Sequence, residues 1–148
     1  MSVRKILVGV DGSAGSGHAI EWAAGLAEDL KADVVAVHVY EPLGHLGDIG
    51  PGVSLADVRD QLADELADIW CEPFHRRNLA VDRRIAEGTP HEAILDIAEE
   101  TEADLIVLGA RRMGPLKAAA LGSTSIRVVH DAVVPVTIVH GNGDETPR

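Results

Sequence analysis

The segment from Gly109 to Ser125 contains residue types that could bind an anion. It begins with a glycine, continues with a pair of arginines, and ends with Gly122 followed by three hydroxyl residues. A helix that starts there would present free backbone N–H groups, the positive end of its dipole and hydroxyl donors. Phosphate is the anion that such a site fits best. In the alternative interpretation, Ser123 or Thr124 only caps the helix and the glycines only form turns.

Asp11 is the second residue that could contact a ligand. It follows the apolar segment Val3–Val10, so a strand there would place Asp11 at its carboxyl end. An Asp at such a junction often forms an Asx turn or starts a helix, and Ser13 can cap the helix that follows. The same position would let Asp11 accept hydrogen bonds from an amino or hydroxyl group of a ligand. Its position alone supports both interpretations equally.

Several well-known site motifs are absent from the sequence. Three glycines, starting at Gly12, have the order G-x-x-G-x-G, with Ile20 where G-x-G-x-x-G would have its third glycine. No Gly-Lys-Ser or Gly-Lys-Thr follows a glycine loop, and there is no G-x-S-x-G elbow. The seven histidines include no i, i+4 pair, and the single cysteine, Cys71, excludes an internal disulfide. We therefore expect neither a metal site nor a catalytic residue of these classes.

Composition and charge argue against two classes of protein. The 148 residues include 13 basic and 24 acidic side chains, a net charge of −11. The basic pairs Arg76-Arg77, Arg83-Arg84 and Arg111-Arg112 are scattered, whereas a nucleic-acid-binding protein needs a basic patch. No apolar stretch approaches the roughly 18 residues of a membrane span, and the first residues lack signal-peptide features. We expect a cytoplasmic protein that binds neither nucleic acid nor membrane.

The elements that must position these residues alternate between strands and helices. Apolar and β-branched runs predict five strands, over residues 3–10, 34–40, 81–87, 103–109 and 133–140. Helical spacing predicts helices over residues 14–31, from 55 to a bend or end near Pro73, from a capping box at Thr89 and Glu92, and over 123–130. The segments 41–52 and 109–122 are expected to be loops. Pro135 cannot donate to a ladder, which places the last strand at an edge or turns its proline nitrogen outward.

This order predicts a three-layer α/β/α sandwich around a five-stranded parallel sheet, joined by right-handed crossovers. In such a Rossmann-like fold, ligands bind at the carboxyl ends of strands where the strand order reverses. The loops after the first and fourth strands are therefore the expected site. We expect one domain over residues 1–141 and a flexible polar tail over 142–148.

Three motifs together resemble the universal stress protein family. They are Val8-Gly9-Val10-Asp11-Gly12-Ser13, Asp104-Leu105-Ile106-Val107-Leu108-Gly109, and Gly122-Ser123-Thr124-Ser125 followed by Val134-Pro135-Val136. The resemblance spans roughly residues 2 to 140, nearly the whole chain. It implies the adenine nucleotide alpha hydrolase-like version of this fold, an α/β sandwich that binds adenine nucleotides.

The resemblance also implies a ligand and the residues that hold it. The ligand is ATP, with or without Mg²⁺. Asp11 and Val39 would line the adenine and ribose end, and the helix start after Gly122 would contact the phosphates. The full set of implied cofactor-binding residues is Asp11, Gly12, Ser13, Val39, Leu108, Gly109, Arg112, Gly122, Ser123, Thr124 and Ser125.

Arg112 departs from the pattern of the family. Members that bind ATP carry G-x-x-G, nine residues, and then G-S or G-T, and Arg112 stands at the second glycine. If the backbone there needs positive φ or close approach to the ligand, the side chain would cost about 1–2 kcal/mol, or about a tenfold loss of affinity. The guanidinium could offset this loss with charge-assisted bonds to phosphate, and Gly114 could supply the missing flexibility.

In this family the last strand often pairs with its copy in a second subunit. The resemblance therefore implies a homodimer through Val133–His140, whose apolar edge a monomer would otherwise expose. An ordinary edge strand protected by Pro135 is the alternative.

The leading functional hypothesis is an ATP-binding regulatory protein of the stress response, with slow or no turnover because the phosphate loop lacks a general base and metal-binding carboxylates. One alternative is a nucleotide-free dimer whose pocket is closed by Arg112 and which acts through an unidentified protein partner. Another alternative is a slow ATP hydrolase.

Overall fold

A five-stranded parallel sheet forms the centre of the computed structural model, which describes residues 2–42, 47, 50–113 and 118–141. The strand order is β3-β2-β1-β4-β7, so the order reverses on either side of the central strand β1. This architecture confirms the predicted fold class. The strands are β1 (Lys5–Gly9), β2 (Asp33–Tyr40), β3 (Val81–Glu87), β4 (Leu105–Gly109) and β7 (Val136–Val139).

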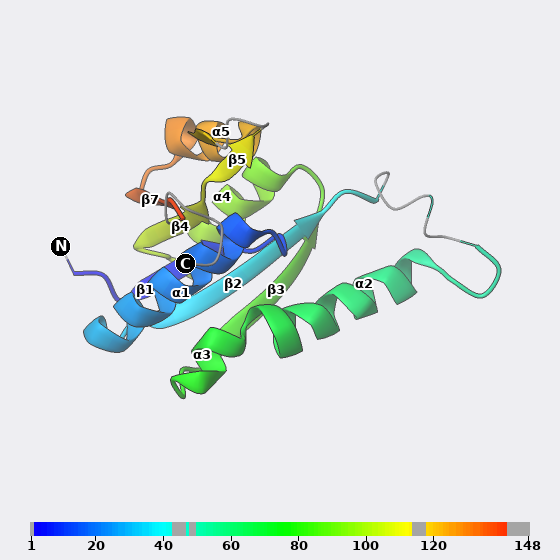
Figure 1. The fold of residues 1–148 in the computed structure, drawn as a ribbon, viewed down its shortest axis with the longest axis horizontal. Coiled ribbons are helices and arrows are strands. Elements are labelled where there is room, and N and C mark those ends of the chain that lie inside the picture. Colours follow the sequence, from blue (N-terminus) through cyan, green and yellow to red (C-terminus); the bar gives the residue numbers. More distant parts are fainter. Residues whose placement is uncertain (1, 43–46, 48–49, 114–117, 142–148) are drawn as a thin grey trace.

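Helices cover both faces of the sheet (Figure 1). Alternate residues of β1 show how: Ile6 and Val8 pack with α1 and the α2–α3 region, whereas Leu7 packs with α4 and α5. Because both faces are covered, the central strands are apolar throughout rather than alternating. The helices are α1 (Ala14–Leu30), α2 (Leu55–Glu65), α3 (Glu72–Arg76), α4 (Pro90–Thr101) and α5 (Ser123–Asp131).

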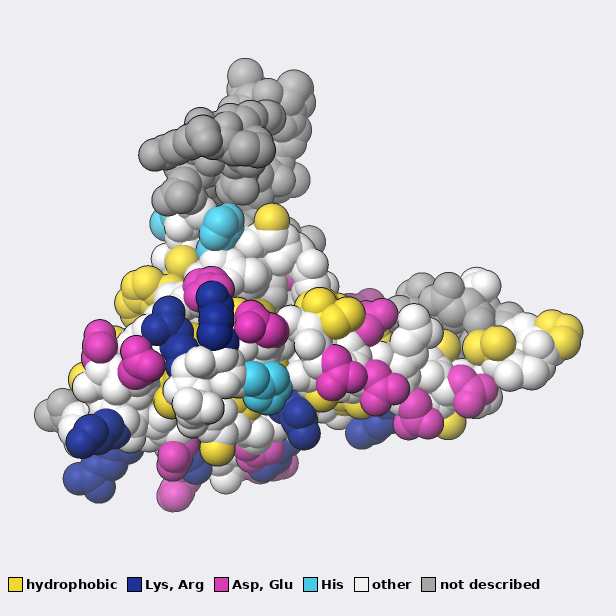
Figure 2. Space-filling model, turned by 60° about the horizontal axis from the view of Figure 1, so that its bottom comes forward, with side chains coloured by type: hydrophobic (Ala, Val, Ile, Leu, Met, Phe, Trp, Pro, Cys, Tyr) yellow, Lys and Arg dark blue, Asp and Glu magenta, His cyan; other side chains and the backbone are white. Residues whose placement is uncertain are grey.

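The second predicted helix, which was expected to bend or end near Pro73, is interrupted before that residue. A π-helical turn, Leu66–Trp70, separates α2 from α3, and Cys71 N–H donates to Leu66 O at 3.0 Å. Pro73 lies near the start of α3, where its missing N–H is not needed. Figure 1 shows α2 extending beyond the sheet, and Figure 2 shows a row of acidic side chains along this extension. Asp57, Asp60 and Asp64 are exposed there.

The predicted capping box at Thr89 and Glu92 is wrong. Thr89 is the N-cap of α4, but its side chain makes no capping hydrogen bond, and both side chains are exposed. Pro90 starts this helix instead, with a φ already suited to it. A capping box does form at α2, where Ser54 and Asp57 each bond the backbone of the other.

The loop predicted between Gly109 and Gly122 contains a β-hairpin that the sequence analysis missed. Strands β5 (Arg111–Met113) and β6 (Ala118–Ala120) pair antiparallel, with Arg112 opposite Ala119. Extended backbone is open to any residue, so this pairing does not require glycine at position 112. Gly114 lies outside the described residues.

The last strand lies at an edge of the sheet, as Pro135 predicted. It begins directly after this proline, and β4 is its partner on the inner side. The tail 142–148 lies outside the described residues. Within the described part of the chain, no helix is both long and apolar enough to span a bilayer.

Candidate functional site

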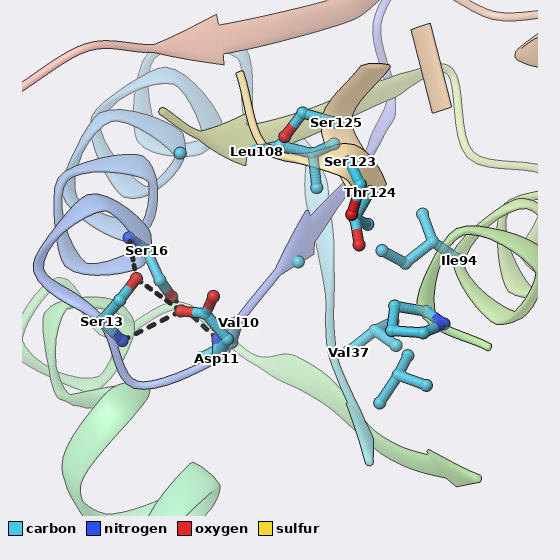
Figure 3. Close-up of a pocket in the computed structure, with 15 residues that line it drawn as sticks. Val10, Asp11, Ser13, Ser16, Val37, Ile94, Leu108, Ser123, Thr124 and Ser125 are labelled. Atoms are coloured by element: carbon cyan, nitrogen blue, oxygen red, sulfur yellow. Dashed lines mark hydrogen bonds between the residues drawn. The ribbon is translucent and has the colours of Figure 1, made fainter. Parts of the chain in front are cut away.

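A cavity of about 190 Å³ lies where the strand order reverses, at the carboxyl ends of the central strands. Its lining comes from β1, β2, β4 and the first turns of α1, α4 and α5 (Figure 3). One wall is apolar and consists of Val37, Val39, Pro90, Ile94 and Leu108. The remaining lining is backbone and short polar side chains. The site therefore combines an apolar slot with hydrogen-bonding groups.

The turn from β1 to α1 is held by a ring of three polar side chains (Figure 3). The Asp11 carboxylate accepts hydrogen bonds from the Ser13 amide at 2.9 Å and the Ser13 hydroxyl at 2.5 Å. Ser13 Oγ in turn accepts from Ser16 N–H at 3.2 Å, and Ser16 Oγ accepts from Asp11 N–H at 3.1 Å. Asp11 therefore fits both interpretations: it forms the Asx turn, and it also lines the cavity.

Gly12 lies at the centre of this turn and does not line the main cavity. Its φ is +80°, which favours glycine, and an added Cβ would lie 2.8 Å from the Trp70 ring. Trp70 also contacts the ring of His38, with centroids 5.0 Å apart. His38 Nδ1–H donates to Val10 O at 2.7 Å, so the end of β1 is held from behind the cavity.

The first turn of α5 offers hydrogen-bond donors on the opposite side of the cavity. Gly122 is the N-cap and supplies no side-chain cap. Among the described residues, the hydroxyls of Ser123, Thr124 and Ser125 have no hydrogen-bond partner, although Ser125 is only 7% exposed. Three adjacent hydroxyls and the uncapped backbone N–H groups thus converge at the positive end of a helix dipole. This arrangement favours an anion.

Tyr40 positions the start of α4, which supplies part of the apolar wall. Its carbonyl accepts from Gly88 N–H at 3.1 Å, and its hydroxyl donates to Glu87 Oε1 at 2.6 Å. Burial, together with the Glu87 carboxylate, raises the pKa of Tyr40, so this hydroxyl stays a donor at neutral pH. These bonds hold the turn that leads into Pro90.

The structure brings most of the sequence-predicted site residues together. Nine of the eleven line the cavity: Asp11, Ser13, Val39, Leu108, Gly109, Gly122, Ser123, Thr124 and Ser125. Gly12 lines an adjoining groove between α1 and Trp70. For Arg112 only the backbone is described, in β5.

Sequence reasoning missed several lining residues, chiefly Ser16, Val37, Pro90 and Ile94. Val37 could have been found, because it lies two residues before Val39 and a strand places such residues on the same face. Pro90 and Ile94 are one helical turn apart on α4. Nothing in the sequence indicated that this helix reaches the cavity.

The described lining of the cavity holds few ionisable side chains. Asp11 is the single carboxylate among these lining residues, and one of its oxygens already accepts two bonds from Ser13. Among the described residues, no three His, Cys, Asp or Glu side chains are grouped so that they could hold a metal ion. The described lining contains no histidine, cysteine or lysine that could act as a general base or nucleophile.

Comparisons with known proteins find one family. Residues 2–140 match the model of the universal stress protein family. A universal stress protein of Thermus aquaticus is 33% identical, and the match covers 92% of this chain and 98% of the relative. Another, of Mycolicibacterium smegmatis, is 32% identical over 93% of this chain, which spans about half (48%) of that relative's length.

A solved structure shows the same fold with a nucleotide. It is a universal stress protein in complex with cAMP, 25% identical to this chain, with a TM-score of 0.65. The match covers 95% of this chain and 98% of that one.

Proposed function

The chain belongs to the universal stress protein family, and from this premise we propose that it is a regulatory protein that binds ATP in the cavity between β1 and β4. The phosphates would lie at the first turn of α5. The adenine would occupy the apolar slot formed by Val37, Val39 and Ile94, where a flat aromatic base is removed from water.

The observation that carries this proposal is the unsatisfied first turn of α5. Ser125 is 7% exposed, and its hydroxyl forms no hydrogen bond with another described residue. Because Ser125 lines the cavity and its oxygen is not among the sealed-off polar atoms of the described residues, this hydroxyl is open to a ligand that binds there. A phosphate oxygen would accept from this hydroxyl, from Ser123 and from the free backbone N–H groups.

The solved relative with cAMP supports an adenine nucleotide as the ligand class. That ligand carries a single phosphate, so the proposal of ATP rests on the length of the Gly109–Ser125 segment and on the family pattern within it. Asp11 would face the ribose, where a carboxylate can accept from a sugar hydroxyl.

Nucleotide analysis and calorimetry test the proposal. Purified protein is denatured and its released nucleotide identified, and the emptied protein is then titrated with ATP and with AMP, with and without Mg²⁺. We expect micromolar affinity for ATP, and the variant Ser123→Ala/Ser125→Ala should bind about tenfold more weakly because it loses hydrogen bonds to charged oxygens. Ser54→Ala, at the N-cap of α2 and outside the cavity, is the matched control. No co-purified nucleotide and no heat with either ligand would refute the proposal.

We further propose that turnover is slow or absent. The described lining has one carboxylate and no other candidate general base, so water would not be activated efficiently. Incubation with ATP should leave most of it unhydrolysed. ADP accumulation that Ser123→Ala abolishes would instead support a slow hydrolase.

We also propose a homodimer through β7. Its outer edge is unpaired in the described chain, and all four of its residues are half-buried. Ile126 and Val129 are exposed on the neighbouring helix α5. Pairing of two such edges would complete the backbone hydrogen bonds and bury apolar side chains.

A further inference from the structure

A second groove lies at the other end of the sheet from the nucleotide cavity. It has a volume of about 390 Å³ and runs between the C-terminal half of α4 and the segment that joins α5 to β7. The start of β4 forms its floor. Helix α5 contributes to both sites, because Ser123–Ser125 line the cavity and Asp131 lines the groove.

The floor and one wall of the groove are apolar. Leu95 and Ala98 of α4 face Ile106 of β4 and Val134 across it. Val133 stands at its rim and is 99% exposed, the most exposed of the large hydrophobic residues described. A branched aliphatic side chain so fully in water contributes nothing to the core of this chain.

The rim carries three acidic residues in positions that the fold itself disfavours. Glu99 lies in the last turn of α4, Glu102 is its C-cap, and Asp131 is the last residue of α5. The C-terminus of a helix is the negative end of its dipole, where carboxylates are destabilising and cations are favoured. The last turn of α4 contains no basic residue.

These carboxylates are not neutralised by neighbouring cations in the described chain. Glu99 and Glu102 form no ion pair with another described residue, and Asp131 contacts only the exposed ring of His130, at 2.7 Å. Glu100 provides the contrast, because it lies on the same helix but pairs with Arg84 at 3.3 Å. The groove thus combines an apolar floor with an uncompensated negative rim.

We propose that this groove docks a basic segment of a partner protein, in which one aliphatic side chain fills the floor and flanking Lys or Arg residues pair with the rim. Charge complementarity selects this occupant. The flanking cations would pair with Glu99, Glu102 and Asp131, whereas the homodimer proposed above uses the outer edge of β7 and not this groove. Binding of this segment would not require a nucleotide in the cavity between β1 and β4, so the proposal goes beyond the function proposed above.

Fluorescence anisotropy tests the proposal with a defined probe. The probe is a fluorescein-labelled peptide of glycine and serine with one central leucine flanked by two lysines on each side. We expect the peptide to bind and its affinity to fall as salt is added. Replacing the leucine by serine, or the lysines by glutamine, should weaken binding about tenfold or more.

Matched variants of the protein locate the binding surface. Glu99→Gln/Glu102→Gln and Val133→Ser should each weaken binding of the peptide about tenfold. Asp60→Asn/Asp64→Asn, which removes the same charge from the exposed face of α2, should change it less than about twofold. Amide resonances of Leu95, Val133 and Val134 should shift when the peptide is added. Circular dichroism verifies that each variant is folded.

Three results would overturn the proposal. In the first, the α2 variant weakens binding as much as the groove variant, which indicates a general attraction to the acidic surface. In the second, Val133→Ser has no effect on binding. In the third, the peptide fails to bind and Val133→Ser turns a dimer into a monomer, which assigns the groove to a second copy. None of these results depends on ATP, so failure here is distinguishable from failure of the proposed nucleotide site.

Discussion

The backbones of Gly15 in α1 and Gly109 in β4 are in direct contact at the edge of the cavity between β1 and β4. A Cβ atom on Gly109 would overlap the carbonyl oxygen of Gly15, and one on Gly15 would overlap the carbonyl oxygen of Ala110. The first turn of α1 can therefore approach the end of β4 only because both positions lack a side chain. This packing requires Gly109 whether or not a ligand is bound.

Gly109→Ala should destabilise the fold. The new methyl group meets backbone rather than a movable side chain, so the free energy of unfolding should fall by about 3 kcal/mol, the upper end of overpacking effects. Gly17→Ala is the control, since its Cβ would enter open space on the same helix and alanine should stabilise the helix by about 1 kcal/mol. Urea unfolding followed by circular dichroism measures both, and equal stability of the two variants would contradict the packing argument.

Alanine variants of the two helix caps, Ser13 and Ser54, distinguish an effect on stability from an effect on ligand binding. Each side chain accepts a hydrogen bond from the backbone N–H three residues on, at 3.2 Å. Replacing either by alanine should lower the free energy of unfolding by about 1 kcal/mol. Only Ser13 lines the cavity and bonds Asp11, so only Ser13→Ala should also weaken ATP binding in calorimetry. Unchanged affinity of Ser13→Ala for ATP would show that the hydrogen-bonded ring of Asp11, Ser13 and Ser16 does not contribute to the ligand site.

Arg112→Gly tests the residue that departs from the family pattern. The extended pairing of Arg112 with Ala119 does not require glycine, so we expect the variant to lose a phosphate-binding cation without gaining needed flexibility. Its dissociation constant for ATP should rise, and Arg112→Lys should retain part of the affinity. Tighter binding by Arg112→Gly would show that the side chain obstructs the pocket.

Ile126→Glu tests the proposed dimer. Ile126 is 54% exposed on α5 beside β7, and a charge there should oppose association of two edges. Ile69→Glu is the control, because Ile69 is even more exposed, at 65%, but lies on the π-helical turn far along the chain from β7. Light scattering after gel filtration should give a dimer for wild type and Ile69→Glu and a monomer for Ile126→Glu. A monomeric wild type would contradict the proposal.

Cys71 should make stability fall at alkaline pH. Burial raises the pKa of its thiol to about 11, whereas an unfolded cysteine has a pKa of about 8.5. Its contribution is fully present below about pH 8.5, where both states keep the proton. Between about 8.5 and 11 the unfolded chain loses the proton and the folded chain keeps it, so the free energy of unfolding decreases as pH rises.

Urea unfolding at a series of pH values measures this effect. Cys71→Ala should be less stable at neutral pH because it leaves a small cavity, but its stability should decline less steeply above about pH 8.5. The folded wild type should also resist thiol reagents, since the side chain is buried. Parallel pH profiles for the two proteins would show that Cys71 does not contribute.

The sequence by itself determined the periodic elements and the local chemistry. The apolar run at Leu105–Leu108 fits a strand covered on both faces, and the order of elements then predicted parallel strands. The three hydroxyls after Gly122 indicated a candidate anion site, because a helix start has the same free N–H groups in any fold.

Only the tertiary structure decided which distant residues meet. Ile94 and Ser16 reach the cavity because α4 and α1 pack on opposite faces of the sheet, and nothing local to either residue encodes that contact. The β5–β6 hairpin was also missed, because the segment between Gly109 and Gly122 carries no alternating apolar pattern. The spacing of residues along the chain determines the hydrogen bonds within one helix or strand. Contacts between elements depend instead on how whole faces of the helices and the sheet pack together.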